Sequence, residues 1–441
     1  MKRILEVAVS FLKVAVFWLA VALAVVGWIT LPWQGVAILS LVLALWLALT
    51  RGGRLALEAT RIGIASLPQR WGASSVIVIG IAGVVGVLVA MLAMGAGFKA
   101  TLDAAGSDDT VIILRSGAKV ESNSNIERSL VPLIAALPGI ERDADGRPLL
   151  SAEVSQVVSL PTRDEGTDAN VQFRGIGPES FAVHGNVRIL EGRAPGTGMR
   201  ELIVGRGAQG QFRGLEVGNT LMLGNQQWTV VGSFASNDAY ESELWGDAET
   251  VAATYRRPSW QSVLVRTGKD GLETFKAALA ADQRLKLDVL TTRSYFAEQS
   301  SQLKTLLDVL GTVIGSIMAV GAVFGALNTM YAAVASRARE IATLRAIGFR
   351  GLPVVTAVML ETMLLALLGG LLGGLIAWLA FNNFSVSTLG NNFSQVVFQF
   401  QVSPALLWTG MKWALGIGLI GGLFPALRAA RLPIVAALRE V

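Results

Sequence analysis

Apolar and polar positions divide this chain into long hydrophobic runs, short basic connectors and one long stretch of mixed composition. A membrane-crossing helix needs about 20 consecutive apolar residues, and six runs approach or exceed that length. We therefore expect an α-helical membrane protein with six transmembrane helices and one inserted external domain. The predicted segments are two N-terminal transmembrane helices (1–50), a basic amphipathic interfacial helix (51–74), a transmembrane helix (75–97), the external domain (98–303), a transmembrane helix (304–335), a short charged cytoplasmic helix (336–350), a transmembrane helix (351–383), a short external loop (384–403), a transmembrane helix (404–425) and a cytoplasmic tail (426–441).

The external domain has the pattern of a mixed α/β fold. Short β-rich runs bounded by Gly, Asn or Pro, such as 110–116 and 226–234, predict strands. Residues 269–283 have the spacing of a helix, and 261–292 as a whole resembles a β-α-β unit. The domain starts where one span ends and returns into the next span, so we expect it to be anchored at both ends.

The placement of basic residues orients the predicted helices. The chain has a net charge of +5, although 52% of its residues are hydrophobic and only 16% are charged. Its arginines gather at 51–70, 337–350 and 428–439, whereas 384–403 contains no Lys or Arg. Because cytoplasmic connectors are enriched in Lys and Arg, we expect both termini inside and 384–403 outside. Every cluster adjoins a span, so the basic charge indicates orientation and not a nucleic-acid partner.

The first apolar run has a second interpretation. Lys2 and Arg3 precede an apolar core, and a small-residue sequence, Ala-Leu-Ala, ends at Ala24, as in a signal peptide. Without that run the next one would still end in the cytoplasm. The predicted orientation of the remaining chain therefore holds under both interpretations.

The polar residues offer little catalytic chemistry. The chain has no cysteine, which excludes disulfides, thiolate catalysis and Cys-ligated metals. The single histidine, His184, has no sequence partners for a triad or a metal site. Gly268 and Lys269 lack the Ser or Thr and the second glycine of a P-loop. We therefore expect no catalytic residue, metal or cofactor on this chain, and no enzyme activity of the chain alone.

Glycines recur four residues apart in two of the predicted spans. This spacing lets helix backbones approach closely, which is how helices pack in lipid, although glycine is common in membrane helices in general. We expect close packing within the chain or between protomers. The residues are Gly311, Gly315, Gly321, Gly325, Gly369, Gly370, Gly373 and Gly374.

Two polar residues stand inside predicted spans, where polar groups cost free energy and tend to be functional. Asn328 lies near the cytoplasmic end of its span and can form a hydrogen bond with a neighbouring helix. Glu361 lies about ten residues into the next span, which is about 15 Å of helix. A carboxylate at that depth is protonated, paired or in contact with water, and structural pairing is the favoured interpretation.

A family resemblance emerges at the charged stretch SRAREIATLRAIGFR, residues 336–350. Together with 327–335 it closely resembles the signature of MacB/FtsX-type ABC transporter permeases. Residues 361–380 and the tail 424–441 are similar to the same family, and 192–234 is similar to its periplasmic core domain. The resemblance extends from about Arg51 to the C-terminus. The usual family pattern has four spans, and this chain has two more before them.

The resemblance implies that 336–350 is a coupling helix seated on an ATPase subunit. Its sequence suits that role, because three apolar residues recur at intervals of three and form a stripe for a groove. An arginine and a glutamate three residues apart can pair, and a glycine lets the chain leave the helix sharply. The predicted coupling residues are Arg337, Glu340, Ile341, Leu344, Arg345, Ile347 and Gly348.

The family also implies the partners. Its permeases dimerise, as homodimers or heterodimers, and dock ABC ATPase subunits that bind ATP and magnesium. A periplasmic adaptor and an outer-membrane channel are further expected partners, and the location is the bacterial inner membrane. The implied function is export, or extraction of a substrate from the periplasm or outer leaflet. Lipoprotein extraction is one variant, and an FtsX-like mechanotransmitting regulator of a cell-wall hydrolase or sensor is the alternative.

Overall fold

The computed structural model describes residues 27–164, 166–390 and 394–433. They divide into two compact units. The helical unit comprises the described residues up to Ala93, then Leu307–Asn382, and those from Gln401 onward. The α/β unit comprises Met94–Leu306 and Asn383–Phe400. Each unit has its own packing and is described separately.

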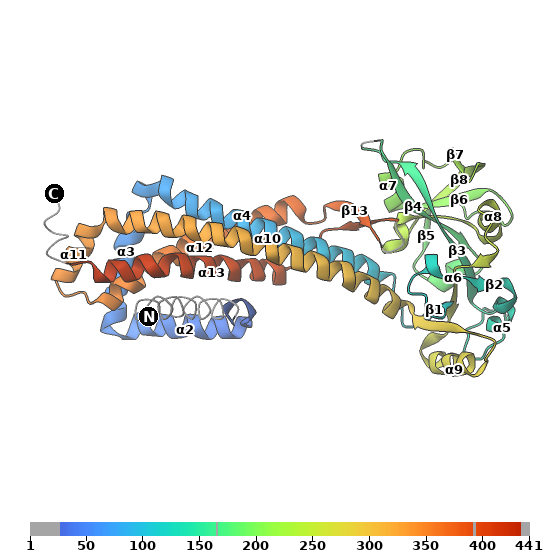
Figure 1. Ribbon diagram of the computed structural model, residues 1–441, viewed down its shortest axis with the longest axis horizontal. Coiled ribbons are helices and arrows are strands. Elements are labelled where there is room, and N and C mark those ends of the chain that lie inside the picture. Colours follow the sequence, from blue (N-terminus) through green and yellow to red (C-terminus); the bar gives the residue numbers. More distant parts are fainter. Residues whose placement is uncertain (1–26, 165, 391–393, 434–441) are drawn as a thin grey trace, which may run out of the picture. The chain divides into compact units, whose positions relative to one another are not determined.

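Long apolar helices make up the helical unit (Figure 1). Their bounds are α2 (Trp33–Leu49), α3 (Arg51–Ala65), η1 (Pro68–Arg70), α4 (Trp71–Ala104), α10 (Thr292–Ser336), α11 (Ala338–Ala346), α12 (Gly351–Phe381) and α13 (Pro404–Arg431). Of α4 and α10, only the residues up to 93 and from 307 belong to this unit. Among the described residues, four stretches are long and apolar enough to cross a membrane: η1 with α4, then α10, α12 and α13. The bent pair α2–α3 makes a fifth if it is counted as one broken span.

The predicted count of six spans therefore rests in part on residues outside this description, because the first predicted helix falls largely within 1–26. The second predicted span corresponds to α2, a helix of 17 residues. It meets α3 at an angle of 96°. Thr50 stands at the bend in extended geometry, and its hydroxyl accepts a hydrogen bond from the Gly53 amide at 2.9 Å, which caps α3.

Glycines hold α12 against its two neighbours. A Cβ added at Gly369 would lie 2.9 Å from atoms of α4, and one at Gly373 only 2.4 Å from a backbone oxygen there. On the side facing α13, a Cβ at Gly370 would lie 2.9 Å from its atoms, and one at Gly374 would lie 3.4 Å away. These four residues give α12 the close approach to two helices that small side chains permit.

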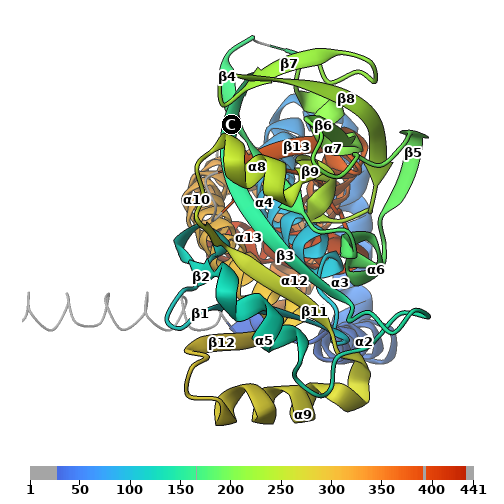
Figure 2. The same cartoon turned by 90° about the vertical axis from the view of Figure 1, so that its right-hand side faces the viewer.

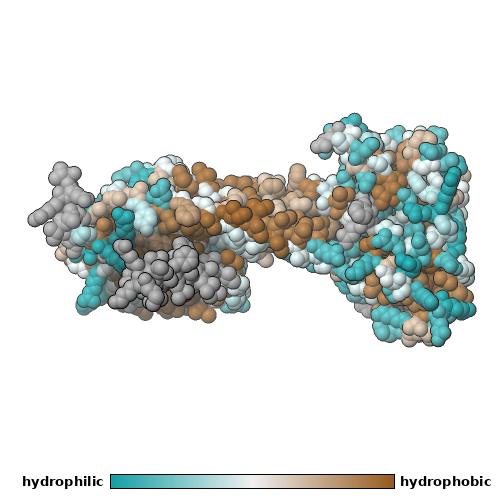
Figure 3. Space-filling model, viewed as in Figure 1, coloured by the Kyte–Doolittle hydropathy of each residue, from teal (hydrophilic) through white to brown (hydrophobic). Residues whose placement is uncertain are grey.

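The glycines of α10 divide into two pairs. A Cβ at Gly311 or Gly315 would lie 2.9 or 3.2 Å from side chains of α4, so this pair packs inside the unit. Nothing lies within 4 Å of such an atom at Gly321 or Gly325. Large apolar side chains are exposed along α2, α10 and α12, and the visible face of these helices is largely hydrophobic (Figure 3). Such a surface suits contact with lipid.

The α/β unit is built on strands and short helices. Its strands are β1 (Thr110–Arg115), β2 (Ile126–Glu127), β3 (Leu150–Pro161), β4 (Asp168–Ile176), β5 (Arg188–Gly192), β6 (Glu201–Gly205), β7 (Thr220–Leu223), β8 (Gln226–Ala235), β9 (Glu243–Asp247), β10 (Ser259–Trp260), β11 (Ser262–Arg266), β12 (Leu287–Thr291), β13 (Ser385–Leu389) and β14 (Gln395–Gln399). Its helices are η2 (Glu121–Asn123), η3 (Arg128–Leu130), α5 (Val131–Ala135), α6 (Ser180–His184), α7 (Arg206–Gln211), η4 (Ala239–Ser242), α8 (Ala248–Thr254) and α9 (Gly268–Ala281).

Ten of the described strands form one mixed sheet, in the order β12-β1-β11-β3-β4-β9-β6-β8-β5, with β7 also paired to β8. The pairs β4–β9 and β6–β8 are parallel and the others are antiparallel. Figure 2 shows β3 beside β11, with α5 and α9 near that end of the sheet. The predicted mixed α/β fold is confirmed. In the predicted β-α-β unit, β1 lies between the two strands.

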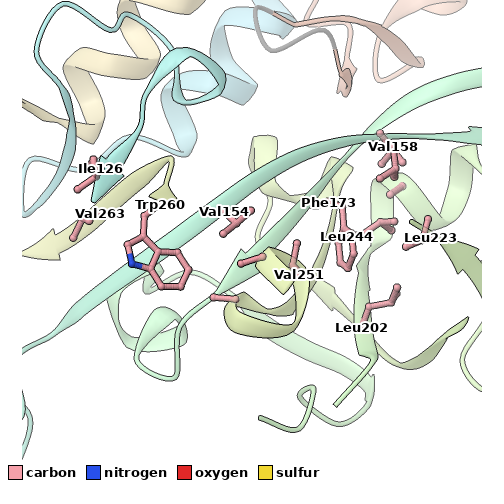
Figure 4. Packing of buried hydrophobic residues seen from close by; sticks show 14 of the residues in the cluster. Ile126, Val154, Val158, Phe173, Leu202, Leu223, Leu244, Val251, Trp260 and Val263 are labelled. Carbon is pink, nitrogen blue, oxygen red and sulfur yellow. The ribbon is translucent and has the colours of Figure 1, made fainter. Parts of the chain in front are cut away.

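The two faces of the sheet carry two different cores. On one face, alternate strand residues such as Phe173 and Leu244 pack against side chains of α5, α8 and α9. These two residues are paired across β4 and β9 and lie side by side in Figure 4. On the other face, Phe98, Trp245 and Tyr295 belong to a second, partly polar core. Side chains alternate along a strand, so both faces of the central strands are buried.

The segment predicted as an external loop, 384–403, is more ordered than a plain loop. Its described residues form the hairpin β13–β14, which packs into the α/β unit. The Val397 amide donates to Ser242 Oγ at 2.8 Å, and the Phe398 and Phe98 rings meet edge to face at 5.5 Å. Alternating Val and Phe in 396–400 supply the apolar side that this packing needs.

Candidate functional site

The short helix α11 forms a corner between α10 and α12. Arg337 leaves helical geometry, with φ −108° and ψ 14°, and α11 begins at the next residue. At its other end Gly348 has φ +111°, which side chains disfavour. The amides of Gly348 and Phe349 donate to the carbonyls of Arg345 and Leu344 at 3.2 and 3.1 Å. These two breaks set a charged helix apart between two long apolar ones.

The exposed face of α11 differs from the predicted stripe. Ile341 is only 6% exposed and packs inside the helical unit, and Leu344 is half-buried, whereas Ile347 is 71% exposed. The reason is helical geometry, because a spacing of three drifts around a helix of 3.6 residues per turn. The face open to a partner is composed of Arg339, Glu340, Thr343, Ala346 and Ile347.

A buried ion triad lies at the base of α11. Glu361, on α12, has a side chain only 4% exposed, and its two carboxylate oxygens bind two different arginines. Arg70 of η1 donates to Oε1 at 2.8 Å, and Arg337 donates to Oε2 at 3.1 Å. Arg337 also donates through Nε to Glu340 at 3.0 Å. Structural pairing of Glu361, as expected from the sequence, is therefore what the contacts show.

Helix α3 leaves room for this triad. A Cβ at Gly63 would lie 2.9 Å from Glu361 Oε2 and 3.4 Å from Arg337 Nη1. Ser66, just after α3, accepts a hydrogen bond from Arg70 at 2.9 Å and so holds that guanidinium in place. The triad thus joins three stretches of chain: the α3–η1 segment, the α10–α11 corner and α12.

Arg345 and Asn328, which the sequence analysis also singled out, lie outside the ion triad. Arg345 points away from the exposed face of α11 and donates from Nη1 to the carbonyl oxygen of Leu432, just after α13. Asn328 is exposed on α10, on the same face of the helix as Gly321 and Gly325. The structure therefore brings together Arg337, Glu340 and Glu361, and leaves Asn328 apart from them.

Sequence reasoning missed Arg70, Gly63 and Ser66. Arg70 was included in a basic cluster, and its charge was assigned only to membrane orientation. The available signal was the isolated carboxylate at Glu361, which required a buried cation as partner. Nothing in the sequence said which of the nearby arginines would supply it.

A lysine inside α13 holds the segment that precedes α2. Lys412 donates from Nζ to the carbonyl oxygens of Ile29 and Leu31, the latter at 3.4 Å. In return Trp28 Nε1 donates to the Lys412 carbonyl at 2.8 Å. These bonds attach residues 28–31, just before α2, to the last apolar helix of the unit.

The α/β unit contains a second buried ion cluster. Arg174 of β4 donates to Glu121 and Glu153 at 2.8 Å and to Glu243 at 2.7 Å. His184 of α6 lies 2.9 Å from the other oxygen of Glu153. Strand alternation places Glu153, Arg174 and Glu243 on the sheet face opposite Phe173. His184 therefore has a partner that its sequence neighbours did not reveal.

Burial and neighbouring charges pull two of these carboxyl groups in opposite directions. Burial raises the pKa of Glu243 above its ordinary value, and Arg174 only partly opposes this. Burial also disfavours ionisation of Glu153, but His184 and Arg174 outweigh it and lower the pKa of that carboxyl to about 2. Glu153 is thus held ionised, and Glu243 is the group on which a proton is favoured.

A cavity of about 50 Å³ adjoins this cluster, lined by Glu121, Arg174 and Glu243 together with aromatic side chains. A single water needs about 10–15 Å³ measured in this way, so the cavity holds only a few waters. Among the described residues, no group of three His, Asp or Glu side chains is arranged to hold a metal ion.

Comparison with known proteins finds two family domains in this chain. Residues 74–282 match the MacB-like periplasmic core domain, and residues 312–434 match the FtsX-like permease C-terminal domain. A chain that joins these two domains is a membrane permease. It belongs to the MacB/FtsX-type ABC transporter permeases, and this family together with its apolar helices indicates a multi-pass protein of the bacterial inner membrane.

Two relatives carry the name "Macrolide export ATP-binding/permease protein MacB". The one from Hahella chejuensis is 26% identical over 381 residues, covering 75% of this chain and 55% of the relative. The one from Escherichia coli is 24% identical over 377 residues, covering 75% and 56%. The chain therefore spans about half the length of these relatives.

Among solved structures, the periplasmic region of MacB from Actinobacillus actinomycetemcomitans aligns at 14% identity with a TM-score of 0.33. The alignment covers 43% of this chain and 92% of that structure. A score at this level adds nothing to the family assignment, which rests on the two matched domains.

Proposed function

We propose that this permease couples ATP hydrolysis in a separate ABC ATPase subunit to movement of its α/β unit, for export or extraction of a substrate from the periplasm or outer leaflet. ATP and magnesium bind to the ATPase, and six spans place both termini in the cytoplasm. A second permease completes the dimer. A periplasmic adaptor and an outer-membrane channel are further partners in this proposal.

The observation that carries the proposal is the exposed face of α11. A short helix between two candidate spans presents Glu340 and Thr343 outward, together with Ile347, the residue directly after it. Its inner side is fixed by Ile341 and by the contacts of Arg337 and Arg345. A rigid helix face with one exposed apolar anchor suits docking into a groove on a partner. The family assignment supports an ATPase subunit as that partner.

The docking proposal is tested with Ile347→Asp. Ile347 is 71% exposed, so the substitution should leave the permease folded and dimeric. A carboxylate desolvated in a partner's groove is strongly unfavourable, and about 1.4 kcal/mol already changes affinity tenfold. We expect recovery of the ATPase in a pull-down to fall at least about tenfold. Transport-linked ATP turnover should fall with it.

The matched control is Met222→Asp, a comparable change at a residue 66% exposed on β7 of the α/β unit. It should leave ATPase recovery at the wild-type level. Equal recovery and turnover in both variants would show that α11 is not the docking element.

The alternative, a mechanotransmitting regulator of a cell-wall hydrolase or sensor, uses the same α11 contact. The two functions differ in what the α/β unit meets. The ten-stranded sheet offers much more surface than a minimal signalling domain needs, which supports the export or extraction proposal. Neighbouring genes for an adaptor or for a hydrolase would separate the two, and transport assays with candidate lipoproteins would test the extraction variant.

A further inference from the structure

The corner helix α11 is attached to the helical unit by non-covalent bonds as well as by its covalent links to α10 and α12. The chain already joins it to α10 and α12, and the ion triad adds a third attachment through Glu361. Arg337 is the central link, because Nη1 binds buried Glu361 while Nε binds Glu340 on the exposed face. A continuous line of charged hydrogen bonds therefore runs from the proposed docking face into α12.

The third stretch in this arrangement is the α3–η1 segment. Arg70 binds the second oxygen of Glu361, and these two residues lie 291 positions apart in the chain. Gly63 of α3 lies against the carboxylate, where even a methyl group would collide. The buried face of α3 consists of small residues at helical spacing, among them Ala56, Thr60 and Gly63, so α3 packs tightly. Movement of Glu361 cannot leave this segment in place without breaking buried charged bonds.

We infer that Glu361 is a positioning residue for coupling: through Arg337 and Arg70 it locks α11, α12 and the α3–η1 segment into one body. The interfacial helix α3 thereby becomes part of the coupling machinery. This inference rests on the proposed function, because it assigns a role to residues behind the docking face. Movement imposed on α11 by an ATPase then passes to α12 and α3 together.

Geometry favours this role over simple neutralisation of a buried charge. One arginine would suffice to neutralise Glu361, yet two arginines from separate segments each take one of its oxygens. A carboxylate bound at both oxygens has a fixed orientation. Both arginine side chains are largely buried, at 19% and 13% exposed, so water competes little for these bonds.

The absence of cysteine makes a direct test possible, because introduced cysteines are the only thiols. Spin labels at Ile347→Cys and Ile62→Cys report the distance between α11 and α3, since both positions are exposed. Labelled permease is diluted with unlabelled permease, so that pairs within one protomer dominate the signal. We expect a narrow distance distribution in the otherwise wild-type chain, and at least a twofold broadening, roughly, when Glu361→Gln removes the shared charge.

The second readout separates positioning from structure. In unlabelled permease saturated with ATPase, Glu361→Gln should lower maximal ATP turnover about tenfold, while the ATPase concentration for half-maximal turnover changes less than about threefold. Arg337→Gln should have the same two effects. It leaves Glu361 paired with Arg70, so it provides the test if Glu361→Gln does not fold. Glu361→Asp should restore part of the turnover.

The matched control is Glu58→Gln, which breaks an exposed pair with Arg61 on α3 and should change neither readout. Unchanged distances and turnover in both triad variants would overturn the inference. Broadening without a loss of turnover would also overturn it, because the triad would then be structural only. A failure of docking to respond to Ile347→Asp would instead refute the proposed function, and the spin-label distances would still report on the triad.

Discussion

The described residues of each unit form a buried ion cluster, and the two clusters are built in opposite ways. In the helical unit one carboxylate, Glu361, is shared by two arginines. In the α/β unit one arginine, Arg174, is shared by three carboxylates. Arginine keeps its proton at any physiological pH, so the two positive charges of the triad are permanent. The negative excess around Arg174 can be relieved by proton uptake, and there burial favours a proton on Glu243.

This difference suits two different tasks. The triad joins three segments of chain through two guanidinium groups that stay charged, as a mechanical joint requires. The cluster around Arg174 joins adjacent strands of one sheet and responds to pH. It therefore stabilises the α/β unit to an extent that depends on the medium, and we expect it to tolerate substitution less well, since it is the more deeply buried of the two.

The largest expected effect is that of Arg174→Gln. It leaves three buried carboxylates without their shared cation, which should cost about 3–5 kcal/mol of stability. Hydrogen exchange of peptides covering β4, measured by mass spectrometry on the full chain in detergent, should show lost protection there. The control is Arg206→Gln, which breaks an ion pair with Glu241. The Arg206 side chain is 57% exposed, so this pair is worth at most about 1 kcal/mol. Equal protection of β4 in both variants would contradict the account.

A smaller loss is expected for Glu361→Gln in the helical unit. The substituted amide can still accept a hydrogen bond, and the two arginines keep Ser66 and Glu340 as partners, so we expect about 1–3 kcal/mol. Thermal unfolding in detergent, compared with Glu58→Gln, measures this. A loss as large as that of Arg174→Gln would mean that the two clusters are equally dependent on their central residue, and the proposed contrast would fail.

Packing in the helical unit offers a comparison without charge. At Gly373 a Cβ would lie 2.4 Å from a backbone oxygen of α4, whereas at Gly325 nothing lies within 4 Å. Gly373→Ala should therefore destabilise the unit by about 1–3 kcal/mol, and Gly325→Ala should be nearly neutral. The same thermal assay distinguishes them. Equal effects would show that the contact with α4 does not matter for stability.

The smallest effect is a pH dependence of the α/β unit. Because the pKa of Glu243 is raised in the folded protein, its contribution to stability is full below the ordinary glutamate pKa of about 4.3 and is lost as pH rises through the folded pKa. Glu153 acts in the opposite sense: its pKa is lowered to about 2, so its contribution is present above about pH 4.3 and is lost as pH falls toward 2.

The unfolding free energy of this unit should therefore pass through a maximum near the ordinary glutamate pKa. Glu243→Gln should flatten the decline on the alkaline side, where one proton contributes at most about 1.4 kcal/mol per pH unit, and leave the acid side unchanged. Unfolding measured by hydrogen exchange between pH 3 and pH 8 checks this. An unchanged alkaline slope would show that Glu243 does not bind the proton.

Much of the fold could be read from the sequence, because long apolar runs and alternating strands are local patterns. The helices α4, α10, α12 and α13 and the mixed α/β fold follow from such patterns. The packing of the hairpin β13–β14 on the α/β unit was missed because the residues that it contacts, such as Ser242, lie in distant parts of the chain. The pairing of Arg70 with Glu361 was missed for the same reason, since 291 positions separate them.

The candidate site was predictable in position but not in orientation. The charged stretch between two apolar runs marked α11, and Gly348 marked its end. The face that α11 exposes depends on what packs behind it, which is tertiary information. Ile341 therefore appeared to belong to an open stripe with Ile347, although it is buried in the unit.

The measurement that tests the central claim most directly is site-specific photo-crosslinking from α11 in membranes containing the ATPase. A photoreactive amino acid replaces either Ile347, the residue that ends α11 and is 71% exposed, or Ile341 within α11, which is 6% exposed. The account predicts an adduct between permease and ATPase from position 347 and little or none from position 341. Absence of the adduct from position 347, with ATPase activity in the same membranes intact, would contradict the assignment of α11 as the coupling helix.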